Sequence, residues 1–185
     1  MKNSYSIFKF TILLIILLSV IYPLTIYGIA QLAPNQGKGE IVTVGGKKVG
    51  YQKIGQKFDQ VNYFWGRPSA VDYNAAGSGG SNKGATNETY LALVQQRINH
   101  FLTLHPYLEK KDIPSEMVTA SGSGLDPNIS PQAALIQVKR IAKARQIDEA
   151  KLTNLVLSKI ESPIAGPEII NVLELNVALD ALNDL

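Results

Sequence analysis

The stretch that decides the architecture of this chain is FTILLIILLSVIYPLTIYGIAQL, which covers residues 10–32. Of its 23 residues, 14 are Leu, Ile, Val or Phe, and no charged residue occurs from Phe10 to Gly37. As an α-helix the stretch would be about 35 Å long, enough to cross a hydrocarbon core of about 30 Å with some tilt. The sequence therefore predicts a transmembrane helix at residues 10–32, with Pro23 as a tolerated kink.

A cleaved signal peptide is the alternative interpretation of this segment. Lys2 and Lys9 would form its basic amino-terminal region, and the small residues of Gly28-Ile29-Ala30 would provide a cleavage site. The apolar residues, however, continue to Leu32, well beyond the roughly 7–15 residues of a signal-peptide core. We therefore expect the segment to stay attached as a single-pass anchor in the lipid bilayer of the cell membrane.

The anchor divides the chain into parts with different expected environments. These parts are a tail at residues 1–9, the helix at 10–32, a linker at 33–39 and a soluble domain at 40–185. Lys9 directly precedes the apolar run, whereas the first basic residue after it, Lys38, is several residues away. By the positive-inside rule, this difference favours an extracytoplasmic soluble domain.

The composition outside the anchor excludes several classes of function. When Lys2 and Lys9 are set aside, 16 basic residues remain against 15 acidic ones, so the net charge of +3 belongs to the anchor flank. A nearly neutral domain lacks the excess of positive charge that nucleic-acid binding requires, and we expect no nucleic-acid partner. The chain has no cysteine, which excludes disulfides, thiolate zinc sites and cysteine nucleophiles.

The soluble domain is predicted to be α+β and rich in helices. Two β-prone runs around Gly45-Gly46 predict a hairpin at residues 40–51. Capping residues predict four helix starts, and a short strand is expected between the first two helices. The predicted helices cover residues 88–104 after Thr86 or Asn87, a segment from Pro131 after Ser130, residues 149–159 after Asp148, and residues 172–182 after Asn171 with Glu174 in a capping box; the strand covers 116–120.

Polar residues on the predicted second helix are expected to face water. They are Gln137, Lys139, Arg140 and Lys143, and with Arg145 the basic ones form a cluster that reads as a solvated face. Tyr63, Phe64 and Trp65 read as local core.

A glycine-rich loop, GSGGSNKG at residues 77–84, leaves two interpretations open. It is not a P-loop, because Lys83 precedes Gly84 and no apolar strand leads into it. One interpretation is a flexible or partner-docking loop whose glycines permit positive φ and close backbone approach. The other is a nucleotide contact, since Ser-Gly-Gly is similar to the signature segment of transporter ATPases. Its candidate residues are Ser78, Gly79, Gly80, Ser81 and Asn82.

Enzyme and metal chemistry have weak support. Ser78 partly matches a nucleophile elbow, which makes a membrane-anchored serine hydrolase the enzyme alternative, but the preceding residues 71–74 are too polar for a buried strand. The only candidate bases are His100 and His105. Because they are five residues apart, they would not share a helix face as a zinc pair does. We expect no catalytic residue and no metal site.

Several segments together resemble the C chain of the Kdp potassium-transporting ATPase. Their order, the single anchor and the total length agree, so the resemblance covers essentially the whole chain. The run from Ser121 to Pro131 is far more specific than a glycine loop alone. The matching segments are residues 63–70 (YFWGRPSA), 73–74, 78–82, 119–127 (TASGSGLDP) with 129–131, 137–138, 140–145, 171–176 (NVLELN) and 178–180.

The resemblance implies a non-catalytic accessory subunit of a hetero-oligomeric complex in which ATP hydrolysis drives potassium uptake. Its partners would be a potassium-channel-like subunit and a P-type ATPase subunit that carries the phosphorylated aspartate. Two roles are implied for the C chain: a catalytic chaperone that raises the ATP affinity of the pump subunit, or an external cap that supports assembly. An outward domain does not meet cytoplasmic ATP, so we expect no tightly bound cofactor, with ATP contact only in the complex.

Overall fold

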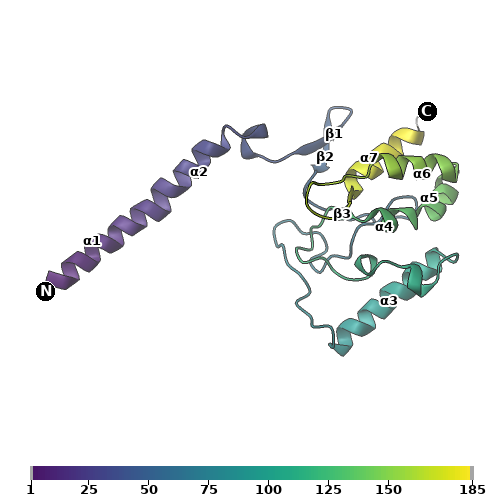
Figure 1. The fold of residues 1–185 in the computed structure, drawn as a ribbon, viewed down its shortest axis with the longest axis horizontal. Helices are drawn as coiled ribbons and strands as arrows, with labels where there is room; N and C mark the ends of the chain where they lie inside the picture. The colour runs from purple at the N-terminus through teal and green to yellow at the C-terminus, as the bar shows by residue number, and fades with distance from the viewer. Residues whose placement is uncertain (1, 184–185) are drawn as a thin grey trace. The chain divides into compact units, whose positions relative to one another are not determined.

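The computed structural model of the protein describes residues 2–183, drawn in Figure 1. The ends of the predicted tail and domain, at residues 1 and 184–185, lie outside the described residues. The chain divides into two units, residues 1–40 and 41–185, and each is described by itself.

The first unit is a long apolar helix with one irregular turn. It consists of α1 (Lys2–Ile16), the π-helical turn η1 (Leu17–Ile21) and α2 (Tyr22–Ala30). The π-turn directly precedes Pro23, which has no N–H to donate and whose ring crowds the carbonyl one turn earlier. The irregularity expected at Pro23 therefore takes the form of a widened turn.

The apolar helix is displaced from the predicted span. Within the described residues, Ser4–Ala30 is the one helix long and apolar enough to cross a membrane, whereas the prediction was 10–32. The helix ends earlier because Ala33 is extended, as residues before proline tend to be, and Pro34–Gly37 (η2) form a separate 3-10 turn. A single N-terminal apolar helix is confirmed, and its retention as a membrane span stays a prediction.

The second unit begins with the predicted hairpin. Strands β1 (Ile41–Val44) and β2 (Lys47–Tyr51) pair antiparallel, and Val44 lies opposite Lys47 across the turn. Gly45 and Gly46 have φ of +55° and +77°. A two-residue turn with positive φ at both positions matches the right-handed twist of the strands, and glycine adopts it without steric cost.

Helices are the main regular secondary structure of the second unit, and three of them start after the expected capping residues. The side chains of Asn87, Ser130 and Asp148 accept bonds from backbone N–H groups of the first helical turn that follows each. The elements are α3 (Glu88–Leu104), η3 (Lys110–Asp112), η4 (Ser115–Met117), β3 (Asn128–Ile129), α4 (Pro131–Leu135), α5 (Val138–Arg145), α6 (Glu149–Ser158), β4 (Ile170–Asn171) and α7 (Val172–Asn183).

The helix predicted from Pro131 is divided into α4 and α5. The break falls at residues 136–137, where Ile136 offers its carbonyl to the hydroxyl of Tyr107 at 2.9 Å. The side chain of Gln137 turns to the backbone of Trp65. Two long-range partners therefore compete with the helical hydrogen bonds at this point, and local sequence does not reveal them.

Two further predictions need correction. The segment 116–120 is not a strand, because no neighbouring strand pairs with it and η4 occupies its start. The capping box at Asn171 is half formed: Asn171 accepts from the amide of Glu174 at 3.1 Å, but the Glu174 carboxylate accepts from Gln52 instead.

The core lies among the C-terminal helices, with α4, α5 and α7 all in contact with α6 (Figure 1). The short pair β3–β4 ties the segment before α4 to the start of α7. This helix-rich α+β fold confirms the predicted class. The largest fully buried apolar side chains are Phe64, Ile129, Ile141, Leu152, Ile170, Leu175, Leu179 and Val156.

Candidate functional site

A loop at residues 61–65 crosses the buried helices without regular secondary structure, and Arg140 of α5 binds its backbone. The guanidinium donates through Nη1 to the carbonyl of Val61 and through Nη2 to that of Tyr63 at 3.0 Å. Nη2 also donates to Gln137 Oε1 at 2.8 Å. Arg140 is only 7% exposed, and burial lowers its pKa to about 10. The positive charge of the buried Arg140 guanidinium is therefore stabilised by hydrogen bonds to carbonyl groups, which carry only partial charges.

An aromatic ring and a second arginine complete this arrangement. The Arg140 guanidinium lies 4.3 Å from the centre of the Trp65 ring, within cation–π range. Arg145 donates from Nε to the carbonyl of Asn62 at 2.7 Å and pairs with Asp180 of α7 at 2.7 Å. Carbonyls of three consecutive residues are thus bound by two arginines that are five residues apart in α5.

His105 closes the buried end of the arginine network. Its Nε2 accepts from Arg140 Nε at 2.9 Å, so its proton is on Nδ1, which donates to the Phe101 carbonyl at 2.7 Å. The side chain is fully buried, and this burial lowers its pKa to about 4 despite the opposing effect of the bond to Phe101. Both ring nitrogens are occupied, so His105 is not available as a general base.

Two amide side chains hold the backbone of the loop end. Asn176 accepts from Phe64 N and donates to Phe64 O, both at 2.9 Å. Gln137 accepts from Trp65 N at 2.8 Å and donates to Trp65 O and Ala133 O at 3.2 and 3.0 Å. Each amide thus replaces the partner strand that this extended segment lacks.

The structure corrects the expected solvation of α5. Lys139 and Lys143 are exposed as predicted, but Gln137 and Arg140 are buried. Helical periodicity places all four of these residues on the polar face of the helix. It cannot predict that carbonyl groups some 80 residues earlier in the chain accept hydrogen bonds from Arg140. Sequence reasoning also missed Asn176 and the buried state of His105, for which a lone polar residue in an apolar pattern was the available signal.

The glycine loop at residues 77–82 packs against the loop at residues 121–124, and we call these two segments the loop pair. The Gly79 amide and the Ser78 hydroxyl both donate to the Ser123 carbonyl, at 2.8 and 3.0 Å. A Cβ placed on Gly80 would lie 2.9 Å from the Gly122 carbonyl oxygen. Backbone therefore approaches backbone closely enough that only glycine fits at position 80 without displacement.

Positive φ occurs elsewhere than expected. Gly77, Gly79 and Gly80 all lack positive φ, and in this loop it is Asn82, at 52°, that adopts it. The expectation of positive-φ glycines is therefore wrong for the loop at 77–82, whereas the expected close approach is confirmed at Gly80. In the facing loop Gly124 has a φ of +68°.

The segment at residues 67–73 joins the loop pair to the rest of the domain. Ser69 donates to the Gly124 carbonyl at 2.7 Å and accepts from the amide of Tyr73 at 2.9 Å. Arg67 pairs with Asp126 at 3.0 Å, and the Tyr73 hydroxyl donates to the Arg67 carbonyl. Burial, together with the Asp126 charge, raises the pKa of Tyr73 to about 12, so its hydroxyl remains a donor.

The five residues predicted for nucleotide contact lie together in the loop pair. Ser78 and Asn82 are exposed, and residues 79–81 are half-buried. The Gly79 amide is committed to Ser123, and the Gly77 amide donates to Asn74 O at 3.0 Å. A phosphate cradle needs several backbone N–H groups directed at the ligand, and these two face carbonyls instead.

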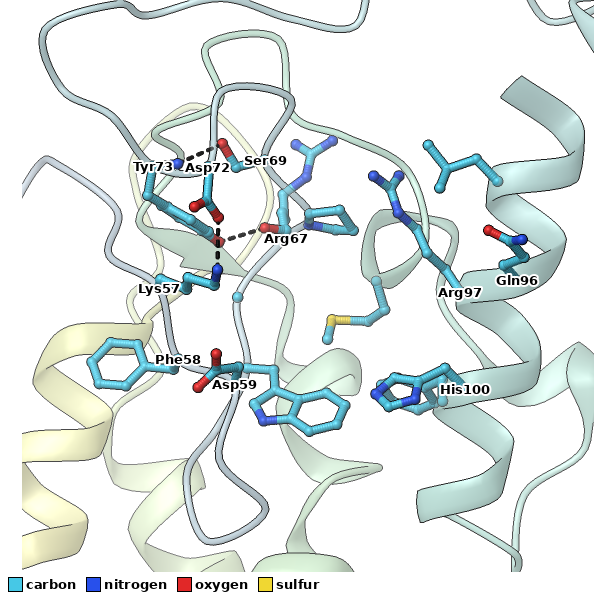
Figure 2. A pocket seen from close by; sticks show the side chains of 16 residues that line it. Lys57, Phe58, Asp59, Arg67, Ser69, Asp72, Tyr73, Gln96, Arg97 and His100 are labelled. Atoms are coloured by element: carbon cyan, nitrogen blue, oxygen red, sulfur yellow. Dashed lines mark hydrogen bonds and ion pairs between the residues drawn. The ribbon is translucent and has the colours of Figure 1, made fainter. Parts of the chain in front are cut away.

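A cleft of about 430 Å³ lies between α3 and the segment at residues 57–73 (Figure 2). On one side Lys57 pairs with Asp72 at 2.8 Å. On the other, Arg97 extends from α3 and donates to the Val118 carbonyl at 3.1 Å. The ring of His100 stacks on Trp65 at its edge, with centroids 5.9 Å apart. Further lining residues are Phe58, Asp59, Gly66, Arg67, Pro68, Ser69, Tyr73, Leu93, Gln96, Phe101 and Met117.

The arrangement has no evident nucleophile–base pair at Ser78. Its hydroxyl is bonded to the Ser123 carbonyl, and His105 is enclosed by Phe101 and Arg140. Among residues 2–183, no cluster of three or more His, Asp or Glu side chains could hold a metal ion. The geometry therefore favours a scaffold for contacts over a reaction centre.

Comparisons with known proteins show the family to which the chain is similar. The family model described as "K+-transporting ATPase, c chain" (KdpC) matches residues 5–181. The chain is 72% identical to the potassium-transporting ATPase KdpC subunit of Flavobacterium johnsoniae, over 98% of this chain and all of the relative. It is 69% identical to that of Flavobacterium psychrophilum over 98% of this chain, and 49% identical to that of Bacteroides fragilis (strain YCH46) over its whole length; both of these relatives are covered completely.

Proposed function

The chain belongs to the KdpC family, the c chain of the K+-transporting ATPase, and we propose that it is a non-catalytic subunit supporting assembly and stability of the transport complex. Its partners would be a potassium-channel-like subunit and a P-type ATPase subunit that carries the phosphorylated aspartate. The soluble domain would lie outside the membrane as a cap on the channel-like subunit.

The loop pair is the observation that carries this proposal. Its polar groups are bonded to one another through Gly79 and Ser78 to Ser123, and Ser69 of the adjoining segment bonds to Gly124. A segment without helix or strand is thereby held in one conformation, as a protein contact surface requires. Exposed groups at Ser78, Gly77 and Asn82 form the outer edge that a partner could meet.

A catalytic chaperone that raises the ATP affinity of the pump subunit is the second candidate. It would use the edge formed by residues 78–82, whose remaining hydroxyl and amide groups can still contact a nucleotide. We rank it lower because two loop amides face carbonyls and because an outward domain is separated from cytoplasmic ATP. Either role leaves the isolated chain without ATP turnover, since it has neither a P-loop nor an Asp-Lys-Thr-Gly segment.

The test compares two glycines of the same loop. Gly80→Val places a side chain against the Gly122 carbonyl, whereas Gly77→Val meets no atom within 4 Å, and neither position has positive φ. Complexes are purified through a tag on the pump subunit. We expect Gly80→Val to reduce co-purification of this chain and Gly77→Val to leave it unchanged, with the ATP dependence of intact complexes the same in both.

The opposite pattern would support the chaperone role. If Gly80→Val complexes assemble normally and their apparent ATP affinity falls, the loop pair contributes to nucleotide binding and not to assembly.

A further inference from the structure

The hairpin β1–β2 belongs to a segment with an unusual charge. Residues 41–58 contain four lysines and no acidic residue, between Glu40 and Asp59. Lys57 is paired with Asp72. Lys47 and Lys48, directly after the glycine turn, are exposed, and no carboxylate among residues 2–183 lies within ion-pair distance of them. The hairpin tip therefore presents two positive charges to its surroundings.

Apolar side chains accompany these charges at the tip. The apolar side chains of Val44 and Val49 are 47% and 37% exposed. Val44 pairs with Lys47 and Thr43 pairs with Lys48, so the two lysines lie on opposite faces of the hairpin. Val44 and Val49 also line a hollow with Leu173 and Val177 of α7, so they border the domain as well as solvent. The two lysines are therefore the groups of the tip that are free to meet a charged surface.

The base of the hairpin is fixed to the domain. Gln56 donates to the Val49 carbonyl at 3.1 Å, and Asn171 donates to the Gln52 carbonyl at 2.7 Å. Gly50 lies so close to Leu173 that a Cβ there would be 2.8 Å from the leucine side chain. The base of the hairpin is therefore held against the start of α7.

The connection to the apolar helix limits how far the tip can move from a bilayer. Ten residues, 31–40, separate the end of α2 from the start of β1. Fully extended they would span at most about 35 Å, and the 3-10 turn at Pro34–Gly37 shortens this reach. The linker thus sets an upper limit on the distance between the start of the hairpin and the end of the apolar helix.

We infer that the hairpin tip binds the anionic headgroup region of the bilayer. Lys47 and Lys48 would contact lipid phosphates at the level of the headgroups. A lysine near an anionic surface increases binding roughly fivefold, and the effect decays within a Debye length. The contact would set the orientation of the soluble domain on the membrane. This inference rests on a retained anchor and not on the assembly role.

The chain has no cysteine, so a single introduced thiol reports on one position. Thr43→Cys, exposed beside the tip, is labelled with an environment-sensitive fluorophore in the full-length protein in lipid nanodiscs. The discs contain either phosphatidylcholine alone or added phosphatidylglycerol, each with a headgroup-proximal spin-labelled lipid as quencher. Asn154→Cys, exposed on α6, is the matched label away from the hairpin.

We expect the label at position 43 to shift to the blue and to be quenched in phosphatidylglycerol discs, with neither effect in phosphatidylcholine or at high salt. Lys47→Gln with Lys48→Gln should lower the ratio of bound to free hairpin by roughly 25-fold, whereas the double change to Arg should retain it. Both lysines are exposed, so folding should be unaffected. Equal quenching in the two lipids, or none in either, overturns the inference. Protection that appears only on assembly with the partner subunits also overturns it and assigns the lysines to an acidic protein surface.

Discussion

Two loops of this domain reach a fixed conformation by different means. The loop at residues 61–65 is held from outside, by the side chains of Arg140, Arg145, Gln137 and Asn176 on distant helices. The loop pair is held from within, by backbone and hydroxyl groups of its own two segments. The loop at residues 61–65 depends on hydrogen bonds from side chains of other elements. The loop pair depends on glycines, which leave room for close backbone contact. Different substitutions should therefore disturb the two loops.

The largest effect is expected at Arg140. Arg140→Ala removes donors to the carbonyls of Val61 and Tyr63 and to His105, and leaves the buried Nε2 of His105 without its donor. We expect a loss of about 3–5 kcal/mol in the free energy of unfolding. Urea unfolding followed by the fluorescence of Trp65, the single tryptophan, measures it.

Lys143→Ala, exposed on the same helix, is the control and should change stability by less than about 0.5 kcal/mol. Equal effects of the two substitutions would contradict the view that Arg140 holds the loop at 61–65.

A pH dependence should come from the same network. His105 has an ordinary pKa of 6.5 in the unfolded chain and about 4 in the folded domain, so below pH 6.5 the unfolded state binds more protons. Its contribution to stability is therefore complete above about pH 6.5 and falls as the pH drops towards 4, by about 3 kcal/mol in total. Unfolding measured across this range should show the decline.

The variant His105→Gln isolates this effect, because its amide can accept from Arg140 without titrating. The variant should lose the histidine part of the decline and keep the part due to carboxylates. If wild type and variant decline in parallel, His105 does not link the 61–65 network to pH.

A smaller effect is expected in the loop pair, at Gly124. Its φ of +68° disfavours other residues, and a Cβ would lie 2.6 Å from Val71 Cγ2 and 2.8 Å from the Gly79 carbonyl oxygen. Gly124→Ala should cost about 1–3 kcal/mol. Gly122→Ala, where a Cβ meets no atom within 4 Å, is the matched control in the same segment. Thermal unfolding of both variants would distinguish the crowded position 124 from the open position 122. Equal losses of stability would contradict the view that close backbone contact holds the loop pair.

The features that could be predicted from sequence are local ones. The hairpin follows from Gly45-Gly46 between β-prone runs, and helix starts follow from Asn87, Ser130 and Asp148. In each case the residues that form the contact are within a few positions of one another. The resemblance to the KdpC family rested on longer segments and is confirmed by the comparisons.

The features that could not be predicted depend on partners far along the chain. The burial of Arg140 is decided by carbonyls of a loop 77–79 residues earlier, and the break between α4 and α5 by Trp65 and Tyr107. Periodicity describes one helix at a time and cannot include such partners. Nucleotide contact by residues 78–82 stays a prediction.

The measurement that tests the account most directly is the side of the membrane on which the soluble domain lies. Asn154→Cys is exposed on α6 and would be the only thiol in the chain. Spheroplasts that produce the complex are treated with a membrane-impermeant maleimide while intact, after lysis and after denaturation. An external assembly subunit predicts the same labelling in intact and lysed spheroplasts. Labelling that appears only after lysis would place the domain with cytoplasmic ATP and contradict the account.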